Sequence, residues 1–191
     1  MEQVSKNTID LFDRLTDQEF LEVKDLFHHQ KLDKGGYVFR EGHKVSYIYF
    51  IASGLVRLFY TDDEAKECIL SFAFENWWET DFSAFYHRVP AISSLQCIED
   101  SEIFSLHYDD YRMLTERYPH LSGYFLDKSV KGHIANQKRI LSLLTLSAKK
   151  RYEQFLQLYP SLIQRIPKSI LSLYLGVSRE TLSRLYKNRN T

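Results

Sequence analysis

The sequence contains few cysteines, no long apolar run and no net charge. Its 191 residues include only Cys68 and Cys97, too few for a disulfide framework, an iron–sulfur cluster or a structural zinc site without other ligands. We expect both to be small buried residues. The longest uncharged apolar stretch, Tyr47 to Ala52, is far shorter than the roughly 18 residues of a membrane helix. Because Met1 to Phe12 also lacks the pattern of an export signal, the sequence predicts a cytoplasmic protein without membrane contact.

The zero net charge conceals a strong polarity along the chain. Residues 1–130 carry 13 basic and 23 acidic side chains, a net charge of −10, whereas residues 131–191 carry 12 basic and two acidic side chains, a net charge of +10. A basic segment is typical of a chain that meets a polyanion, and nucleic acid is the commonest one. We therefore expect only the C-terminal part to contact nucleic acid.

The composition and the first half of the chain predict a folded β-rich domain. With 44% hydrophobic and 15% aromatic residues, the chain can bury a sizeable core. A short amphipathic helix is expected to begin at the capping sequence Thr16-Asp17-Gln18-Glu19 and to continue through Phe20, Val23, Leu26 and Phe27. After the turn at Lys34-Gly35-Gly36, short β-branched and aromatic runs predict an antiparallel jelly-roll β-barrel. The runs are Tyr37–Phe39, Tyr47–Ala52, Leu55–Tyr60, Cys68–Phe74, Ile92–Ile98 and Glu102–Leu106.

Helices are predicted beyond Asp109-Asp110. Apolar and amide side chains recur there at spacings of 4, 3, 4 and 3, the seam of a helix that packs lengthwise on a second helix; they are Val130, Ile134, Gln137, Leu141 and Leu144. Alternatively, this seam packs against the barrel of the same chain. A second helix is expected from the Ser147 N-cap to just before Pro160, and a third from Pro167 to about Leu175.

The end of the chain has the spacing of a helix-turn-helix. The turn Gly176-Val177-Ser178 separates the third helix from a fourth, which runs from Arg179 to about Asn188. At 100° per residue, Leu182 and Leu185 lie opposite a polar face; we expect them to pack on Ile170, Leu173 and Tyr174. The polar face holds Arg179, Glu180, Ser183, Arg184 and Lys187.

The polar face suits the reading of bases in a DNA major groove. Arginine pairs with guanine O6 and N7, and glutamate accepts from cytosine N4. The predicted base-reading residues are Arg179, Glu180, Ser183 and Arg184, and the predicted phosphate contacts are Lys149, Lys150, Arg151, Arg165, Lys168, Lys187 and Arg189. The alternative is an ordinary solvated charged face. The excess of basic residues and the glycine turn favour DNA.

Several stretches of the sequence resemble parts of one protein family. Ser178-Arg179-Glu180-Thr181-Leu182-Ser183-Arg184 resembles the recognition helix of the Crp/Fnr family of bacterial transcription regulators. Arg40-Glu41-Gly42 and Tyr47 to Arg57 resemble the start of that family's cyclic-nucleotide-binding-type barrel. Leu143 to Tyr159, together with Ile166 to Lys187, resembles the subgroup common in Bacteroidetes.

The resemblance implies an α+β chain of three parts. Residues 1–110 would form a cyclic-nucleotide-binding-like jelly-roll sensor domain, residues 111–145 a dimerisation helix that carries the seam, and residues 146–191 a helix-turn-helix domain. A homodimer of this kind reads a near-palindromic operator with half-sites about 34 Å apart, and RNA polymerase is a further candidate partner. Because the chain ends at Thr191, we expect no wing after the last helix and expect Lys149-Lys150-Arg151 to supply phosphate contacts instead.

The same resemblance argues against cyclic AMP as the effector. The phosphate cassette of cyclic-nucleotide-binding members resembles Gly-Glu followed about ten residues later by Arg, whereas this chain has Thr80-Asp81 and then Ala91-Ile92-Ser93. Without that arginine a buried phosphate would be uncompensated, unless Arg88 replaces it. The effector therefore stays unknown, with Asp81 and Arg88 as candidate pocket residues. The nearby aromatics are expected to be core, with a pocket for an apolar or aromatic effector as the alternative; they are Trp77, Trp78, Phe82, Phe85 and Tyr86.

Other function classes have less support. No His-x-His of a cupin-type metalloenzyme, no nucleophile elbow, no phosphate loop and no His-Glu-x-x-His occurs, so the sequence predicts no enzyme, no metal and no cofactor. The clustered N-terminal cysteines of the family's iron–sulfur members are missing, and nothing marks a haem ligand. A further alternative is a protein that keeps the regulator fold but acts as a protein-interaction module. The presence of Arg179, Glu180 and Arg184 argues against it.

Overall fold

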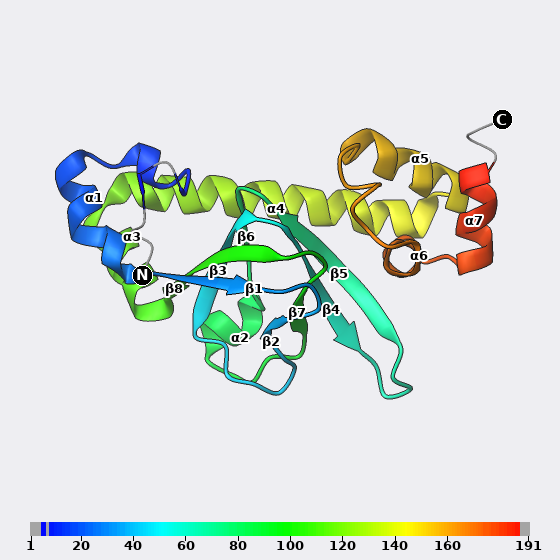
Figure 1. The fold of residues 1–191 in the computed structure, drawn as a ribbon, viewed down its shortest axis with the longest axis horizontal. Coiled ribbons are helices and arrows are strands. Elements are labelled where there is room, and N and C mark those ends of the chain that lie inside the picture. Colours follow the sequence, from blue (N-terminus) through cyan, green and yellow to red (C-terminus); the bar gives the residue numbers. More distant parts are fainter. Residues whose placement is uncertain (1–4, 7, 188–191) are drawn as a thin grey trace.

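The computed structural model describes residues 5–6 and 8–187. A long helix lies along a β-barrel, with small helices packed at each of its ends (Figure 1). The helices are η1 (Phe12–Arg14), α1 (Asp17–Val23), η2 (Lys24–Leu26), α2 (Phe82–His87), α3 (Tyr108–Arg117), α4 (Pro119–Thr145), α5 (Ala148–Leu158), α6 (Lys168–Leu175) and α7 (Arg179–Lys187). The strands are β1 (Phe27–Leu32), β2 (Tyr37–Phe39), β3 (Tyr47–Ser53), β4 (Leu55–Thr61), β5 (Glu67–Phe74), β6 (Trp77–Glu79), β7 (Ser94–Cys97) and β8 (Ser101–His107).

The barrel consists of two four-stranded antiparallel sheets, which confirms the predicted antiparallel barrel. The strand orders are β1-β8-β3-β6 and β2-β7-β4-β5. The strands alternate in direction because each pairs antiparallel with its neighbours, as expected for short strands joined by tight turns. Fully buried side chains from both sheets, including Ile51, Val56, Leu95 and Ile103, fill the interior.

The expected first helix is shorter than predicted. Thr16 and Glu19 form the predicted capping box, in which the Glu19 backbone N–H donates to Thr16 and the Thr16 N–H donates to the Glu19 carboxylate. The α-helix ends at Val23, and Phe27 begins strand β1 instead of lying in the helix. Phe27 pairs with Leu106 of β8, and its ring lies 4.9 Å from the ring of Phe12. These tertiary contacts outweigh the helical periodicity and place Phe27 in a strand.

The predicted seam lies on helix α4 and does not pack on the barrel. Val130 is 47% exposed and Leu144 is 78% exposed, and Ile134, Gln137 and Leu141 are exposed as well. The alternative that the seam packs against the chain's own barrel is therefore wrong. Helix α4 contacts the barrel through residues outside the seam instead: Trp78 Nε1 donates to the Tyr124 hydroxyl over 2.8 Å, and Arg139 Nη2 donates to the backbone oxygen of Ile69 over 2.6 Å.

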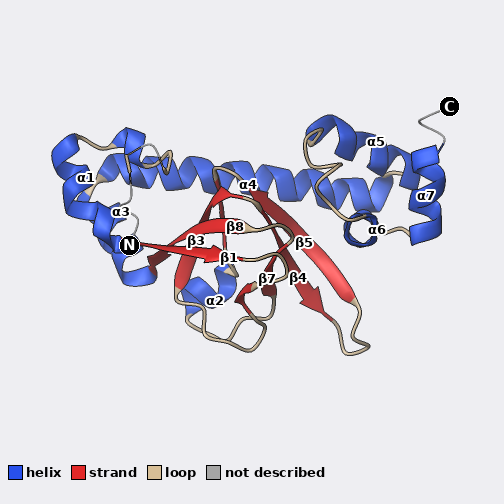
Figure 2. Cartoon of the chain, in the orientation of Figure 1, coloured by secondary structure: helices blue, strands red, loops and turns tan. Residues whose placement is uncertain are grey.

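The C-terminal helices form a compact unit beside the barrel (Figure 2). Helix α5 begins after the predicted Ser147 N-cap and ends before Pro160, and Pro167 is the N-cap of α6 rather than its first residue. Leu171, Leu175 and Leu182 are buried in one cluster that also includes the barrel residues Leu55 and Ile98. Ile170, Tyr174 and Leu185 border this cluster as expected, whereas Leu173 is not part of it. The helical unit and the barrel therefore share a core.

Two expectations about side-chain burial are wrong in part. Cys97 is buried, but Cys68 is exposed, because it points outward from the edge strand β5 while its neighbour Ile69 points inward. Among the expected core aromatics, Trp78 and Phe85 are buried, whereas Phe82 and Tyr86 on the short helix α2 are each 46% exposed.

Within residues 5–6 and 8–187, no helix combines the length and the apolar composition needed to cross a bilayer.

Candidate nucleic-acid interface

The turn between α6 and α7 positions the last helix. Gly176 adopts a left-handed conformation with φ +63°, which glycine reaches without steric cost. Ser178 then accepts a hydrogen bond from the Thr181 backbone N–H over 3.2 Å, in the manner of an N-cap. On the inner side, Leu182 is completely buried. The helix is therefore held at its start and along one face, which leaves the opposite face open.

All four predicted base-reading residues lie on the open face of α7. Arg179, Glu180, Ser183 and Arg184 are exposed, whereas Thr181, Leu182, Leu185 and Tyr186 are buried or half-buried. Backbone N–H groups at the helix start, and then the Ser178 hydroxyl, hold the pKa of Glu180 below its usual value. Glu180 is therefore ionised at neutral pH and can act as a hydrogen-bond acceptor, while the two arginines of this face act as donors.

Four of the predicted phosphate contacts are exposed lysines on the helical unit, and Arg189 lies outside the described residues. Lys149 and Lys150 lie in the first turn of α5, and the Lys149 Nζ is 3.9 Å from the carboxylate of Glu153. Lys187 is in the last turn of α7. Lys168 at the start of α6 is also exposed, with its Nζ 4.4 Å from the centre of the Tyr186 ring. These four cations come from three helices of the unit, α5, α6 and α7.

Arg151 and Arg165 are engaged within the chain and are not placed as free phosphate contacts. Arg151 donates to the carbonyl oxygens of Leu146 and Leu175 over 2.8 and 2.9 Å. It thereby caps the C-terminal end of α6, where a cation is favoured. Arg165 forms ion pairs with Glu75 over 2.8 Å and with Glu99 over 2.7 Å.

The Arg165 ion pairs join the helical unit to the barrel. Hydrogen bonds to Glu75, and then to Glu99, raise the pKa of Arg165 above its usual range. Although burial alone would raise the pKa of Glu75, hydrogen bonds from Arg165 and from backbone N–H groups keep it below its usual value. The predicted phosphate contact of Arg165 followed from its charge alone, since its two acidic partners lie 90 and 66 residues earlier in the chain.

In the barrel, the Asp81 carboxylate accepts hydrogen bonds from the donor groups that a bound anion would use. It is the N-cap of α2 and accepts hydrogen bonds from the Ala84 N–H over 3.0 Å, the Ile92 N–H over 3.1 Å and the Ser93 hydroxyl over 2.8 Å. Asp81 is buried, at 5% exposure. A bound phosphate would compete with this carboxylate for the same donors.

Arg88 does not take part in this arrangement. It ends α2 in a left-handed conformation and donates from Nη2 to Asp109 over 2.6 Å, and its side chain is 57% exposed. Ala91, at the position of the missing arginine, is buried. The structure therefore brings Asp81 together with Ile92 and Ser93, and it places Arg88 on the surface.

A second buried acid, Glu79, lies next to Asp81 and was not identified from the sequence. Its carboxylate accepts from the Ser71 hydroxyl over 2.6 Å and from the Thr80 N–H over 3.1 Å. Burial, together with the negative charge of Asp81, raises the pKa of Glu79 to about 7. The only signal in the sequence is an acid within the apolar run Trp77-Trp78-Glu79. Two acids side by side make this end of the barrel unfavourable for an anion.

Among the residues that the structure describes, no group of three or more His, Cys, Asp or Glu side chains could hold a metal ion.

Comparison with known proteins identifies the fold. Residues 29–118 match the family model of the cyclic nucleotide-binding domain. The structure is similar to that of the c-di-GMP responsive global regulator CLP from Xanthomonas campestris, at 18% identity and a TM-score of 0.71, with 91% of this chain and 92% of that chain covered. It is also similar to a protein from Eubacterium rectale assigned to the transcriptional regulators of the Crp/Fnr family, at 16% identity, a TM-score of 0.72, and 95% and 87% coverage.

The sensor domain of the transcriptional regulator DNR from Pseudomonas aeruginosa is a third similar structure, at 26% identity and a TM-score of 0.55, with 72% of this chain and 89% of that chain covered. No curated protein sequence matches the chain. Residues 29–118 thus match a cyclic nucleotide-binding domain, and the fold of the chain is similar to those of solved Crp/Fnr-type regulators.

Proposed function

We propose that this protein is a DNA-binding transcription regulator of the Crp/Fnr type, which reads its operator with helix α7. The observation that carries the proposal is the separation of side chains on α7. Its apolar side chains are buried against α6, and Arg179, Glu180, Ser183 and Arg184 are presented together on the exposed side. These residue types match the donor and acceptor pattern of G·C pairs in the major groove. In this proposal the protein catalyses no reaction.

The regulator is a homodimer that forms along α4. Exposed apolar residues extend over the whole predicted seam and beyond it, including Leu126 at 65% exposure. A stripe of this kind on a long helix is covered when a second copy packs against it. The dimer presents two α7 helices to half-sites about 34 Å apart, and the operator is therefore near-palindromic.

The barrel does not respond to cyclic AMP. The carboxylate of Asp81 already accepts from the donors that a cyclic phosphate would need, and the Arg88 side chain pairs with Asp109. An anion placed there would meet a buried carboxylate without a compensating cation, which is strongly unfavourable. Calorimetric titration with cyclic AMP is expected to show no binding, and micromolar affinity would contradict this part of the proposal.

The remaining assignments follow from the same proposal. Residues 1–110 act as the sensor domain, residues 111–145 as the dimerisation segment and residues 146–191 as the DNA-binding domain of a cytoplasmic regulator. RNA polymerase is its further partner at the promoter. The stretches Leu143 to Tyr159 and Ile166 to Lys187 support membership of the subgroup common in Bacteroidetes.

Selection of bound duplexes from a random DNA pool, at two salt concentrations, tests the proposed function. We expect enrichment of a near-palindrome with G·C pairs in each half-site, and retention of that preference at the higher salt concentration. The chain with Arg179 and Arg184 both replaced by Ala serves as the control, because its fold depends on the opposite face of α7. Enrichment of no sequence by the unmodified chain, or of the same sequence by the double variant, would contradict the proposal.

A further inference from the structure

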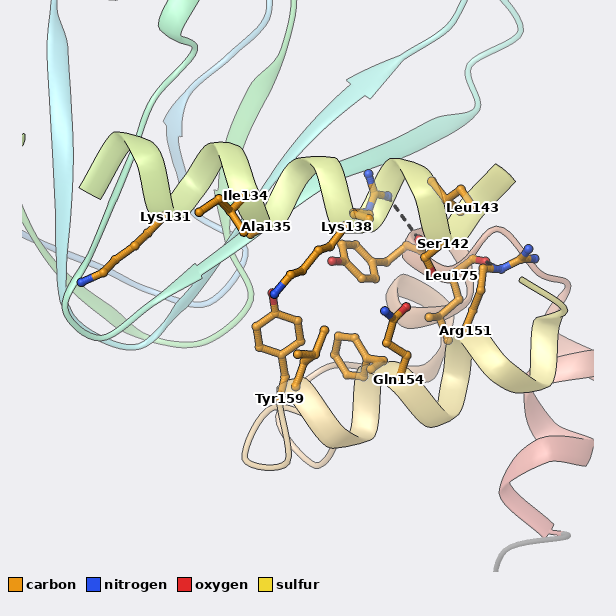
Figure 3. Close-up of a pocket in the computed structure, with 14 residues that line it drawn as sticks. Lys131, Ile134, Ala135, Lys138, Ser142, Leu143, Arg151, Gln154, Tyr159 and Leu175 are labelled. Carbon is orange, nitrogen blue, oxygen red and sulfur yellow. Dashed lines mark hydrogen bonds between the residues drawn. The ribbon is translucent and has the colours of Figure 1, made fainter. Parts of the chain in front are cut away.

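A cavity lies where the long helix α4 meets α5 and α6. Its volume is about 190 Å³. Figure 3 shows Lys138 projecting from α4 and Gln154 from α5 into the space between these helices. The apolar part of the lining includes Phe155, Leu158 and Leu175. This cavity, which we call the α4–α5 cavity, includes no residue of the Asp81 site or of α7.

The α4–α5 cavity is lined by Arg139, whose charge has no carboxylate partner in the described part of the chain. Arg139 Nη2 donates to the backbone oxygens of Ile69 over 2.6 Å and Tyr174 over 3.2 Å. Its Nε is buried and has no hydrogen-bond partner among the described residues. Carbonyl oxygens satisfy single donors but leave the positive charge uncompensated, which is unfavourable in a buried position. Burial accordingly lowers the pKa of Arg139.

Three further cations line the cavity, and no acid from the described residues does. They are Lys131, Lys138 and Arg151. Lys131 pairs with Asp127 over 2.7 Å, and Arg151 donates to carbonyl oxygens of the helix ends. Lys138 is exposed at the rim. The α4–α5 cavity is therefore a positively charged site that attracts an anion.

The remaining side chains that line the cavity favour a ligand with a flat apolar ring. The rings of Phe155, Tyr159 and Tyr174 line the cavity, and the Arg139 guanidinium lies 4.3 Å from the centre of the Tyr174 ring. A cavity of about 150 Å³ holds one benzene molecule, so 190 Å³ has room for one ring and a carboxylate group.

We propose that the α4–α5 cavity binds a small aromatic carboxylate, with its carboxylate on Arg139 and its ring among the aromatic side chains. The Nη2 group of the guanidinium already donates to two carbonyl oxygens, and its Nη1 group, which has no hydrogen bond to a described residue, provides a charged donor for a carboxylate. Arg139 contacts β5 through Ile69 and α6 through Tyr174, so the ligand would bind where the barrel, α4 and the helical unit meet. The proposal is independent of DNA binding and of the Asp81 site, since it uses none of their residues.

Ligand-observed fluorine NMR with 4-fluorobenzoate and the full-length chain tests the proposal. We expect line broadening that saturates with added protein, and a loss of affinity of about tenfold or more in Arg139→Gln, because a charge-assisted hydrogen bond is removed. The neutral analogue 4-fluorobenzyl alcohol is expected to bind at least about tenfold more weakly to the unmodified chain for the same reason. Ala135→Leu, which narrows the cavity without changing its charge, is expected to weaken binding too.

Lys149→Gln is the matched control, because it removes a positive charge from α5 outside the cavity and is expected to leave the affinity unchanged. Circular dichroism establishes that each variant is folded, and Ala135→Leu keeps the test decisive if Arg139→Gln does not fold. Absence of binding up to about 10 mM, equal binding of the neutral analogue, or equal binding by a folded Arg139→Gln or Ala135→Leu variant would overturn the proposal.

Discussion

Arg184 is the residue at which the proposed base reading can be tested most directly. Its side chain is exposed on α7, with its Nη2 3.5 Å from the Thr181 hydroxyl, so its replacement leaves the core intact. We expect Arg184→Ala to weaken specific binding by about 1 to 3 kcal/mol and to relax the preference at one base position. Gel-shift titrations with the selected operator and its single-base variants measure both effects. A variant that keeps the full preference would show that Arg184 does not read a base.

Glu79 is expected to make the stability of the protein depend on pH. Its pKa of about 7 in the folded chain exceeds the ordinary value of about 4.3 in an unfolded chain. The folded state therefore holds a proton that the unfolded state releases, and the free energy of unfolding falls as the pH rises through this interval. Between pH 5 and pH 8 we expect a loss on the order of 3 kcal/mol from this group.

Urea unfolding at several pH values measures this loss, and Glu79→Gln is expected to remove it. Other groups titrate in the same interval, so the slope of the variant is compared with that of Glu116→Gln, which changes an exposed acid on α3. Equal slopes in the two variants would mean that Glu79 is ionised in the folded chain throughout this range.

The local sequence pattern predicts which residues lie on the open face of α7, but it does not predict the contacts of side chains whose partners are distant in the chain. The positions of Arg179 and Arg184 follow from the helical repeat alone, because the buried side of α7 is defined by neighbours within one turn. Arg165 has its partners in the turns after strands β5 and β7, and Arg139 has a partner on β5, so no local pattern links either arginine to its partners. The engagement of Arg165 in ion pairs and the burial of Arg139 therefore emerge only from the folded chain.

At the scale of elements, the exposed seam of α4 predicts how the chain associates. Leu141 is 61% exposed and Leu144 is 78% exposed, and each contributes about 1.5 to 3 kcal/mol when its side chain is buried in a dimer. We expect the double variant Leu141→Asp with Leu144→Asp to be monomeric in sedimentation equilibrium, whereas the unmodified chain has twice the chain mass. Leu21→Asp, at an exposed position of α1, is the control and should remain dimeric. A dimeric double variant would place the interface elsewhere.

The elements that the sequence predicts are those with a strong local pattern. The strands from β2 to β5, β7 and β8 are rich in β-branched and aromatic residues, and the capping signals of α1 and α5 are local. Strand β1 contains His28, His29, Gln30 and Lys31, which favour no strand by themselves. It forms because it pairs with β8, whose paired residues lie 69 to 79 positions later in the chain. The three-residue strand β6 and the six-residue helix α2 are too short for periodicity to identify.

At the scale of the whole molecule, the salt dependence of DNA binding distinguishes exposed basic side chains from those that form ion pairs within the chain. Each phosphate contact contributes about 0.9 to the slope of log K against log salt concentration. We expect Lys150→Gln to reduce the slope by about this amount per bound chain, because Lys150 is exposed at the start of α5. Arg165→Gln is expected to leave the slope unchanged, because Arg165 is paired with Glu75 and Glu99.

Fluorescence anisotropy titrations of the selected operator over a range of salt concentrations measure both slopes. A reduced slope in Arg165→Gln would indicate that Arg165 leaves its carboxylate partners when DNA binds. The helical unit would then separate from the barrel in the complex, since Arg165 joins the two.

Because α4 is long, a small rotation at one of its ends produces a large displacement at the other. Its 27 residues extend over about 40 Å, from its first residue, Pro119, to the helical unit that carries α7. A rotation of about 10° about its N-terminal end moves its far end by about 7 Å, roughly twice the 3.4 Å step between successive base pairs. A small change in packing around Trp78 and Tyr124 would thus shift α7 by two base pairs along a duplex, enough to bring both half-sites into register or out of it.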